Sequence, residues 1–115
     1  MHDNHINYVE FYATDLEKIK AFYSQVFGWS FTDYGPTYTA FSESGLKGGF
    51  EKAEEVQKGG PLLILYHHDL EAVKEKILTA GGSISKDTFS FPGGKRFQFL
   101  DPAGNELSVW MEVES

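Results

Sequence analysis

A glutamate flanked by tyrosines is the first group in the sequence that could do chemistry. Residues 6–13 are predicted to form a strand, whose two-residue period places Tyr8, Glu10 and Tyr12 on one face. We expect the Glu10 carboxylate to enter a cleft among aromatic groups. Loss of hydration there would favour its protonated form and suit it to act as a general base, with the tyrosines as substrate contacts. The alternative is an exposed glutamate, or one paired with Lys95 or Arg96.

A second set of candidates lies on a predicted hairpin near the C-terminus. Two alternating apolar and polar runs flank Asp101-Pro102-Ala103-Gly104-Asn105, a sequence that favours a chain reversal. On the second strand, Ser108 could hydrogen-bond a ligand carbonyl and Trp110 could stack on a flat ligand. On the first strand, Arg96 and Gln98 could anchor a carboxylate or phosphate, although an exposed strand arginine is the other interpretation.

The histidines do not form a metal-binding pattern. His2 and His5 lie in a polar N-terminal segment, and His67 and His68 are adjacent at the end of a predicted strand, where their side chains should point to opposite sides. We interpret them as surface or helix-capping residues and predict no bound metal or other cofactor.

Composition limits the partners of the chain. With 17 acidic and 10 basic residues the net charge is −7, which disfavours nucleic-acid binding. The absence of cysteine excludes disulfides and fits a cytoplasmic protein. The longest apolar run, residues 61–66, is too short to cross a bilayer. We therefore expect a cytoplasmic protein that binds neither nucleic acid nor membrane.

The elements that position these residues form two similar halves. Asp15-Leu16-Glu17 and Asp69-Leu70-Glu71 each open a predicted helix that follows one strand and precedes three more. The first half has strands at 6–13, 29–33, 38–42 and 45–52 around a helix at 16–27. The second has strands at 62–66, 83–86, 95–100 and 106–112 around a helix at 69–80. We predict an α+β fold of two βαβββ modules (1–53 and 62–115) joined by a linker (54–61), with residues 89–94 as a mobile loop or a dimer contact.

Two segments resemble the vicinal oxygen chelate superfamily, which includes glyoxalase I, bleomycin-resistance proteins and extradiol dioxygenases. They are ATDLEKIKAFYSQVFGW, which contains the first helix, and FLDPAGNELSVW, which contains the hairpin turn. The chain looks most similar to small glyoxalase-related proteins of unassigned substrate. The resemblance implies that two curled sheets form an incomplete barrel, with a cleft on their concave faces, helices on their convex faces, and a homodimer.

The resemblance also implies four cleft positions that hold a divalent metal in metal-dependent relatives. They fall at Tyr8, about Leu62, Ser108 and a position between Gly48 and Glu51, where only Glu51 could bind a metal. Tyrosine, leucine and serine are poor ligands for Fe, Ni or Zn at neutral pH. Glyoxalase I activity is therefore not expected.

Two functions remain open from the sequence. The first is a metal-independent lyase or isomerase that binds a small, partly apolar or aromatic molecule and uses Glu10 as its base. The second is a non-catalytic protein that sequesters a drug or metabolite, as bleomycin-resistance proteins do, in which the acidic surface would suit cationic molecules.

Overall fold

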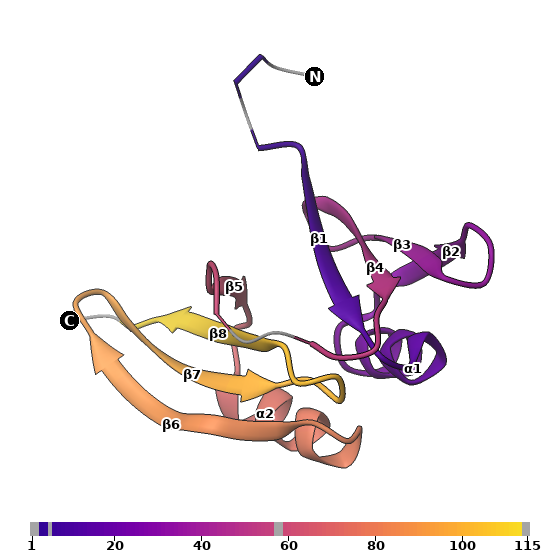
Figure 1. The fold of residues 1–115 in the computed structure, drawn as a ribbon. Coiled ribbons are helices and arrows are strands. Elements are labelled where there is room, and N and C mark those ends of the chain that lie inside the picture. The colour runs from indigo at the N-terminus through magenta and orange to yellow at the C-terminus, as the bar shows by residue number, and fades with distance from the viewer. Residues whose placement is uncertain (1–2, 5, 57–58, 114–115) are drawn as a thin grey trace.

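The computed structural model describes residues 3–4, 6–56 and 59–113. Within these residues, eight strands and two helices follow the predicted order, which is strand, helix and three strands in each half (Figure 1). Their bounds are β1 (Tyr8–Ala13), α1 (Leu16–Phe27), β2 (Ser30–Asp33), β3 (Tyr38–Ser42), β4 (Lys47–Lys52), β5 (Leu63–Tyr66), α2 (Leu70–Thr79), β6 (Ser83–Phe91), β7 (Gly94–Leu100) and β8 (Glu106–Glu112). The predicted α+β class is confirmed. Gln57 and Lys58, in the predicted linker, lie outside the described residues, as do His2 and His5.

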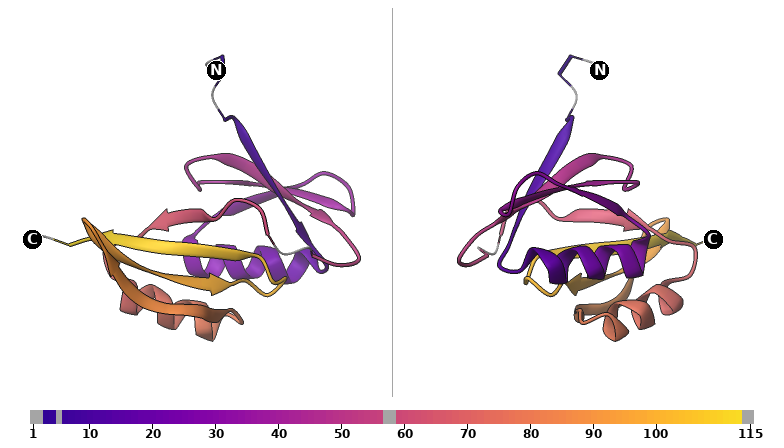
Figure 2. Two further views of the ribbon diagram at one scale, coloured as in Figure 1. Left: turned by 60° about the vertical axis from the view of Figure 1, so that its left-hand side comes forward. Right: turned by 90° about the vertical axis from the view of Figure 1, so that its right-hand side faces the viewer.

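Each half of the chain forms its own four-stranded sheet. The first sheet has the order β1-β4-β3-β2 and the second has the order β5-β8-β7-β6. In each, the outer strand that precedes the helix pairs in parallel with the last strand of the module, while the other pairs are antiparallel. Both helices lie on the lower side of the sheets (Figure 2). The sheets do not close into a barrel.

The two helices begin at equivalent capping residues. The Asp15 carboxylate accepts a hydrogen bond from the Lys18 amide, and the Asp69 carboxylate accepts one from the Ala72 amide, both at 3.1 Å. These bonds satisfy amides that have no partner inside a helix. Gly28 ends α1 in the left-handed region, with φ +74°.

The structure corrects the prediction of a loop at residues 89–94. β6 continues through Phe91, and β7 begins at Gly94, so only Pro92 and Gly93 form the turn. Proline followed by a glycine at φ +96° suits a tight turn. Irregular pairing on either side of Lys86 interrupts the strand period, which hid the length of β6 in the sequence.

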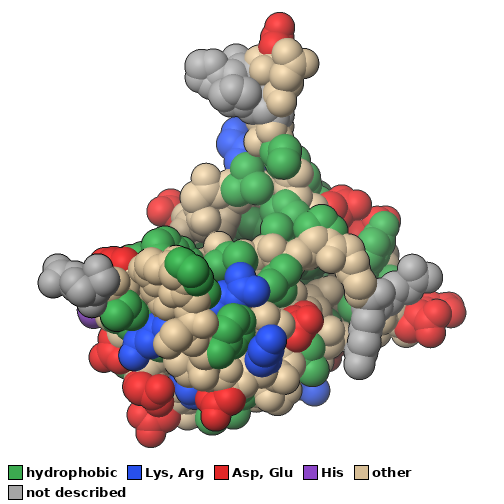
Figure 3. Space-filling model, turned by 90° about the vertical axis from the view of Figure 1, so that its left-hand side faces the viewer, with side chains coloured by type: hydrophobic (Ala, Val, Ile, Leu, Met, Phe, Trp, Pro, Cys, Tyr) green, Lys and Arg blue, Asp and Glu red, His purple; other side chains and the backbone are tan. Residues whose placement is uncertain are grey.

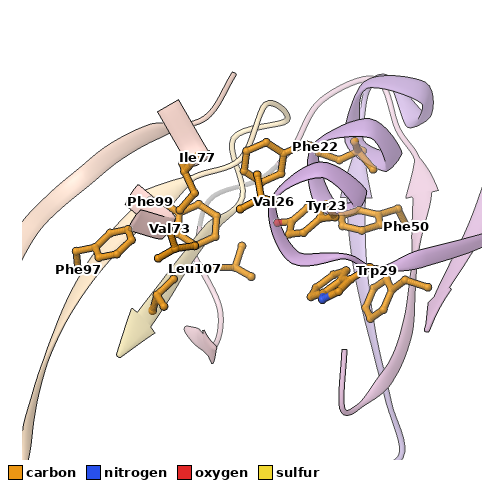
Figure 4. Packing of buried hydrophobic residues seen from close by; sticks show 14 of the residues in the cluster. Phe22, Tyr23, Val26, Trp29, Phe50, Val73, Ile77, Phe97, Phe99 and Leu107 are labelled. Carbon is orange, nitrogen blue, oxygen red and sulfur yellow. The ribbon is translucent and has the colours of Figure 1, made fainter. Parts of the chain in front are cut away.

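The hydrophobic core is shared by the two modules because α1 contacts both sheets. The Tyr23 ring lies 5.4 Å from Phe50 of β4, while the Phe22 ring lies 6.2 Å from Phe99 of β7. On the second sheet, α2 covers the same face with Val73 and Ile77, which are completely buried (Figure 4). This packing covers one face of each sheet and leaves the other face open.

A buried hydrogen bond joins the modules at the edge of this core. The Tyr23 hydroxyl of α1 donates to the Asp101 carboxylate at 2.8 Å, and Asp101 also accepts from the amides of Ala103 and Asn105. Asp101 therefore caps its own turn, in agreement with the predicted chain reversal at residues 101–105. The Asn105 side chain donates in turn to the Tyr12 carbonyl of β1 at 3.0 Å. Burial, the largest effect, raises the pKa of the Tyr23 phenol well above its usual value, and the Asp101 charge adds to the rise.

Within the described ranges, neither helix is long and apolar enough to cross a membrane. A cytoplasmic location stays a prediction.

Replacing Tyr23 with Phe should lower the free energy of unfolding at pH 7 by about 1–3 kcal/mol, because the buried Asp101 carboxylate loses a donor. The raised pKa adds a pH dependence. Tyr23 ionises near pH 10 only in the unfolded chain, so its stabilisation is complete below that pH and is lost as pH rises beyond it. Tyr23→Phe should therefore lose less stability than the native chain between pH 9 and 11. Urea unfolding at pH 7, 9 and 11 measures the free energy of unfolding of each chain. Tyr34→Phe is the control, because Tyr34 is exposed. Equal stability of Tyr23→Phe and the native chain at pH 7 would contradict the role of the bond.

Candidate functional site

The open face of the second sheet carries two rows of side chains that run across its strands. Residues in each row are register partners, so their side chains lie on the same side of the sheet. The first row is Tyr66, Trp110, Arg96 and Phe89, and the second is Ile64, Ser108, Gln98 and Lys86. We call these two rows, with Phe91, the second-sheet face. Of the predicted contact residues, Arg96, Gln98, Ser108 and Trp110 lie on this face.

Aromatic rings dominate the first row. The Tyr66 and Trp110 rings meet edge to face with their centroids 5.4 Å apart, and the Phe91 ring lies 6.3 Å from Trp110. A Cβ atom at Gly94 would come within 3.2 Å of the Trp110 ring and 2.4 Å of the Met111 carbonyl oxygen. The glycine therefore lets the rings approach the backbone. Tyr66 is half exposed and Trp110 is partly exposed, so ring surface remains available for a flat molecule.

Arg96 lies in the same row, between Trp110 and Phe89. Its guanidinium carbon is 5.1 Å from the centroid of the Phe89 ring and 5.9 Å from that of Phe91. Lys86 shares the Phe89 ring, with its Nζ 4.4 Å from the centroid. The Arg96 Nε is buried and has no hydrogen-bond partner among the residues that the structure describes. On this side of the molecule, Lys and Arg side chains lie next to hydrophobic ones (Figure 3).

The polar members of the second row are already engaged within the chain. Ser108 is fully buried, and its hydroxyl donates to the Phe97 carbonyl at 2.8 Å. Its proton is therefore not free for a ligand carbonyl, which corrects the role expected from its position on the strand. Gln98 donates from its side-chain nitrogen to the Glu106 carboxylate at 3.3 Å, which leaves its side-chain oxygen for another contact.

The open face of the first sheet holds the predicted residues Tyr8, Glu10 and Tyr12, which we call the Glu10 group. It also holds a tyrosine, Tyr38, that sequence reasoning missed. The Tyr38 hydroxyl lies 2.5 Å from that of Tyr8, and the Tyr38 ring crosses Gly49, where a Cβ atom would lie 2.5 Å from the hydroxyl oxygen. Burial raises the pKa of Tyr38, and its hydrogen bonds with Tyr8 and Glu10 raise it further. The absence of a side chain at Gly49 was the one signal in the sequence that a ring could lie there.

Glu10 itself is exposed, as in the alternative interpretation of the sequence, and its carboxylate is not buried among aromatic groups. Tyr12 is also exposed, as is Glu51 on the neighbouring strand. The role of Glu10 as a base stays a prediction, with the Tyr38 hydroxyl as its neighbour.

The two groups of predicted site residues lie on different sheets. The parts of the chain described here show no hydrogen bond or ring contact between the Glu10 group and the second-sheet face. A pocket of about 150 Å³ lies between the modules, but it is lined mainly by apolar residues, among them Phe11, Trp29, Phe41, Leu65 and Leu107. None of the predicted site residues lines this pocket.

His67, which precedes the cap of the second helix, has a structural role. His67 accepts a hydrogen bond from the Asp69 amide through Nδ1 at 2.9 Å, which confirms a capping role. The His67 and His68 rings stack with their centroids 4.8 Å apart, so the prediction that they point to opposite sides is wrong. Among the residues that the structure describes, no group of three or more His, Asp or Glu side chains could hold a metal.

Comparison with known proteins agrees with this architecture. A family model described as the Glyoxalase/Bleomycin resistance protein/Dioxygenase superfamily matches residues 5–109. The chain belongs to this superfamily. A "Glyoxylase-like domain-containing protein" of Didymella fabae is 33% identical to this chain, and the match covers 90% of this chain and 91% of that protein.

Solved structures show the same fold for this member of the glyoxalase superfamily. A glyoxalase/bleomycin resistance protein/dioxygenase family enzyme from Burkholderia phytofirmans matches with a TM-score of 0.82 and 19% identity, covering 93% of this chain and 98% of the other. A glyoxalase-related enzyme from Fulvimarina pelagi matches with a TM-score of 0.79 and 20% identity, covering 95% and 88%. The predicted resemblance is confirmed at the level of family and fold.

The residues at the four implied metal positions do not fit a divalent cation. The Tyr8 phenol is bonded to Tyr38, Leu62 is apolar, and the Ser108 hydroxyl donates to a backbone carbonyl. The fourth position is found by comparing the two modules. Glu10 and Ile64 are equivalent, because each precedes the aspartate that caps the following helix by the same number of residues. Ser108 pairs with Ile64 and Gly49 pairs with Glu10, so Gly49 is the equivalent of Ser108. A site with no carboxylate or imidazole lacks the ligands that Fe, Ni and Zn prefer.

We predict that the purified protein retains far less than one equivalent of Ni, Zn or Fe after incubation with each metal and dialysis. Elemental analysis of the dialysed protein measures the ratio directly. One firmly held equivalent would show that other residues supply a site, and it would contradict the donor set described here.

Proposed function

We propose that this protein binds a small, planar, partly apolar molecule on the second-sheet face and acts as a binding protein of the bleomycin-resistance kind. The observation that supports this most directly is the row formed by Tyr66, Trp110, Arg96 and Phe89. Its rings present partly exposed surface at fixed distances from one another, which suits stacking on a flat molecule.

A homodimer is the second part of this proposal. β1 and β5 each pair on one side only, so each leaves a row of backbone groups that another chain can cover. Ile6, Tyr8 and Ile64, on or beside these strands, are exposed hydrophobic residues that a partner could bury. Association of two copies would also add walls to the open faces and form a deeper cleft.

Replacing Trp110 with Ala should weaken binding of the neutral planar probe 2-naphthamide about three- to tenfold, because the stacking surface is lost. Trp110→Phe should keep most of the affinity. Isothermal titration of the full-length protein gives both values. Tyr34→Ala is the matched control, because Tyr34 is also an exposed aromatic residue but lies in the first module. Absence of binding to the native chain, or equal affinity in Trp110→Ala, would contradict the proposal.

A metal-independent lyase or isomerase is the second candidate function, and one contact favours it. Glu10 lies near enough to Tyr38 to raise the pKa of its phenol, and the Tyr38 hydroxyl also meets that of Tyr8. A carboxylate beside two phenols could remove a proton from carbon while a phenol donates a hydrogen bond to the developing enolate oxygen.

This candidate predicts that the protein accelerates exchange of the acidic carbon-bound protons of phenylpyruvate with D₂O. Glu10→Gln should reduce the acceleration about 10²- to 10⁴-fold, as expected for loss of a general base. Proton NMR follows the exchange. Glu43→Gln, which removes an exposed glutamate from the turn after β3, is the control. Equal rates for Glu10→Gln and the native chain would remove Glu10 from the mechanism.

A further inference from the structure

The cations on the second-sheet face are left without acidic partners, although the chain is strongly acidic. Two other partly buried cations do pair with carboxylates: Lys20 lies 3.0 Å from Asp33, and Lys74 lies 3.1 Å from Asp87. Arg96 and Lys86 form no ion pair with any residue in the described parts of the chain. Their positive charge is therefore available to a ligand.

The acidic side chains at the ends of this face are engaged by neutral donors instead. Glu106 accepts hydrogen bonds from Ser85 at 2.7 Å and Gln98 at 3.3 Å. Glu112 accepts one from the Tyr66 hydroxyl at 2.7 Å, the contact that contributes most to lowering its pKa. Neither carboxylate forms an ion pair with Arg96. On this face the carboxylates of Glu106 and Glu112 are hydrogen-bonded to neutral groups, while Arg96 and Lys86 form no ion pair with a described residue.

We propose that the ligand is a planar carboxylate and that Arg96 is its anchor. This inference rests on the proposed binding function and assigns the charge of the ligand. The Phe89 and Phe91 rings hold the guanidinium by cation–π contacts, which fixes a planar set of donors beside the Trp110 ring. A guanidinium binds a carboxylate through two parallel hydrogen bonds, so an aryl carboxylate can stack on Trp110 while its oxygens meet Arg96. Lys86 adds a second positive charge at the Phe89 ring.

The assignment reverses the expectation drawn from the net charge. A chain of net charge −7 attracts cations at long range, but salt screens such effects beyond about 8–10 Å. Within contact distance, the charges of Arg96 and Lys86 decide. A planar cation placed on Trp110 would lie beside the Arg96 guanidinium, which is its neighbour in the row.

Three probes with the same ring system test the inference by titration of the full-length protein: 2-naphthoate, the neutral 2-naphthamide and the cationic 2-naphthylmethylammonium. We expect 2-naphthoate to bind at least tenfold more tightly than 2-naphthamide, and the cation to bind most weakly. Equal affinities for the anion and the amide, both reduced in Trp110→Ala, would overturn the carboxylate assignment while the proposed function stands. Absence of binding by all three probes would overturn both.

The variant Arg96→Met keeps a long side chain on the Phe rings and removes the charge. It should reduce 2-naphthoate affinity to that of 2-naphthamide and change the amide affinity less than twofold. Lys95→Met is the matched control, because it also removes one positive charge. Lys95 is adjacent to Arg96 in the strand, but it pairs with Met111 and its side chain lies on the other face of the sheet. Arg96→Lys, which keeps the charge but loses the planar donors, should bind 2-naphthoate with intermediate affinity. If Arg96→Met does not fold, the probe comparison on the native chain still decides.

Discussion

The hydrogen bond between Tyr23 and Asp101 is the contact on which the arrangement of the two modules depends. It joins a helix of the first module to a turn of the second, and both groups are buried. A buried phenol and carboxylate that did not meet would each lose hydration without compensation, so this pair strongly favours one relative position of the modules. The bond from Asn105 to the Tyr12 carbonyl fixes the same turn against β1.

This joint makes α1 a layer that serves both sheets. Phe22 and Tyr23 are neighbours on the helix, yet one contacts the second sheet and the other the first. α1 covers the apolar face of the first sheet, and α1 and α2 together cover that of the second. Glu10 and Trp110 therefore lie on the opposite faces of the sheets, which neither helix covers. The candidate sites are thus a consequence of how the core is shared, and the distance between them follows from the same packing.

Much of this architecture could be predicted from the sequence, because it depends on local patterns. Aspartate caps, helical periodicity and alternating strands identified both modules. The register between β7 and β8, which places Arg96 and Gln98 on the face of Trp110, came from the structure. The errors arose where tertiary contacts decide. The irregular pairing around Lys86 concealed the continuation of β6, because an extra residue breaks the period of two.

Side-chain availability could not be read from parity either. Parity gives the side of the sheet but not what covers it, so it predicted neither the exposure of Glu10 nor the bond from Ser108 to the Phe97 carbonyl. It also gave no sign that Tyr38 would reach Tyr8, because that contact joins two strands separated by β4.

Small residues at the implied metal positions change the chemistry of both faces. At Gly49 the missing side chain makes room for the Tyr38 ring, since any Cβ atom there would collide with it. At Ser108 the short side chain turns back to its own sheet and leaves Trp110 and Arg96 as the groups that protrude. The loss of ligands is therefore coupled to a gain of rings and of a free guanidinium. The core lies on the opposite faces, so the family fold does not depend on which groups the open faces carry.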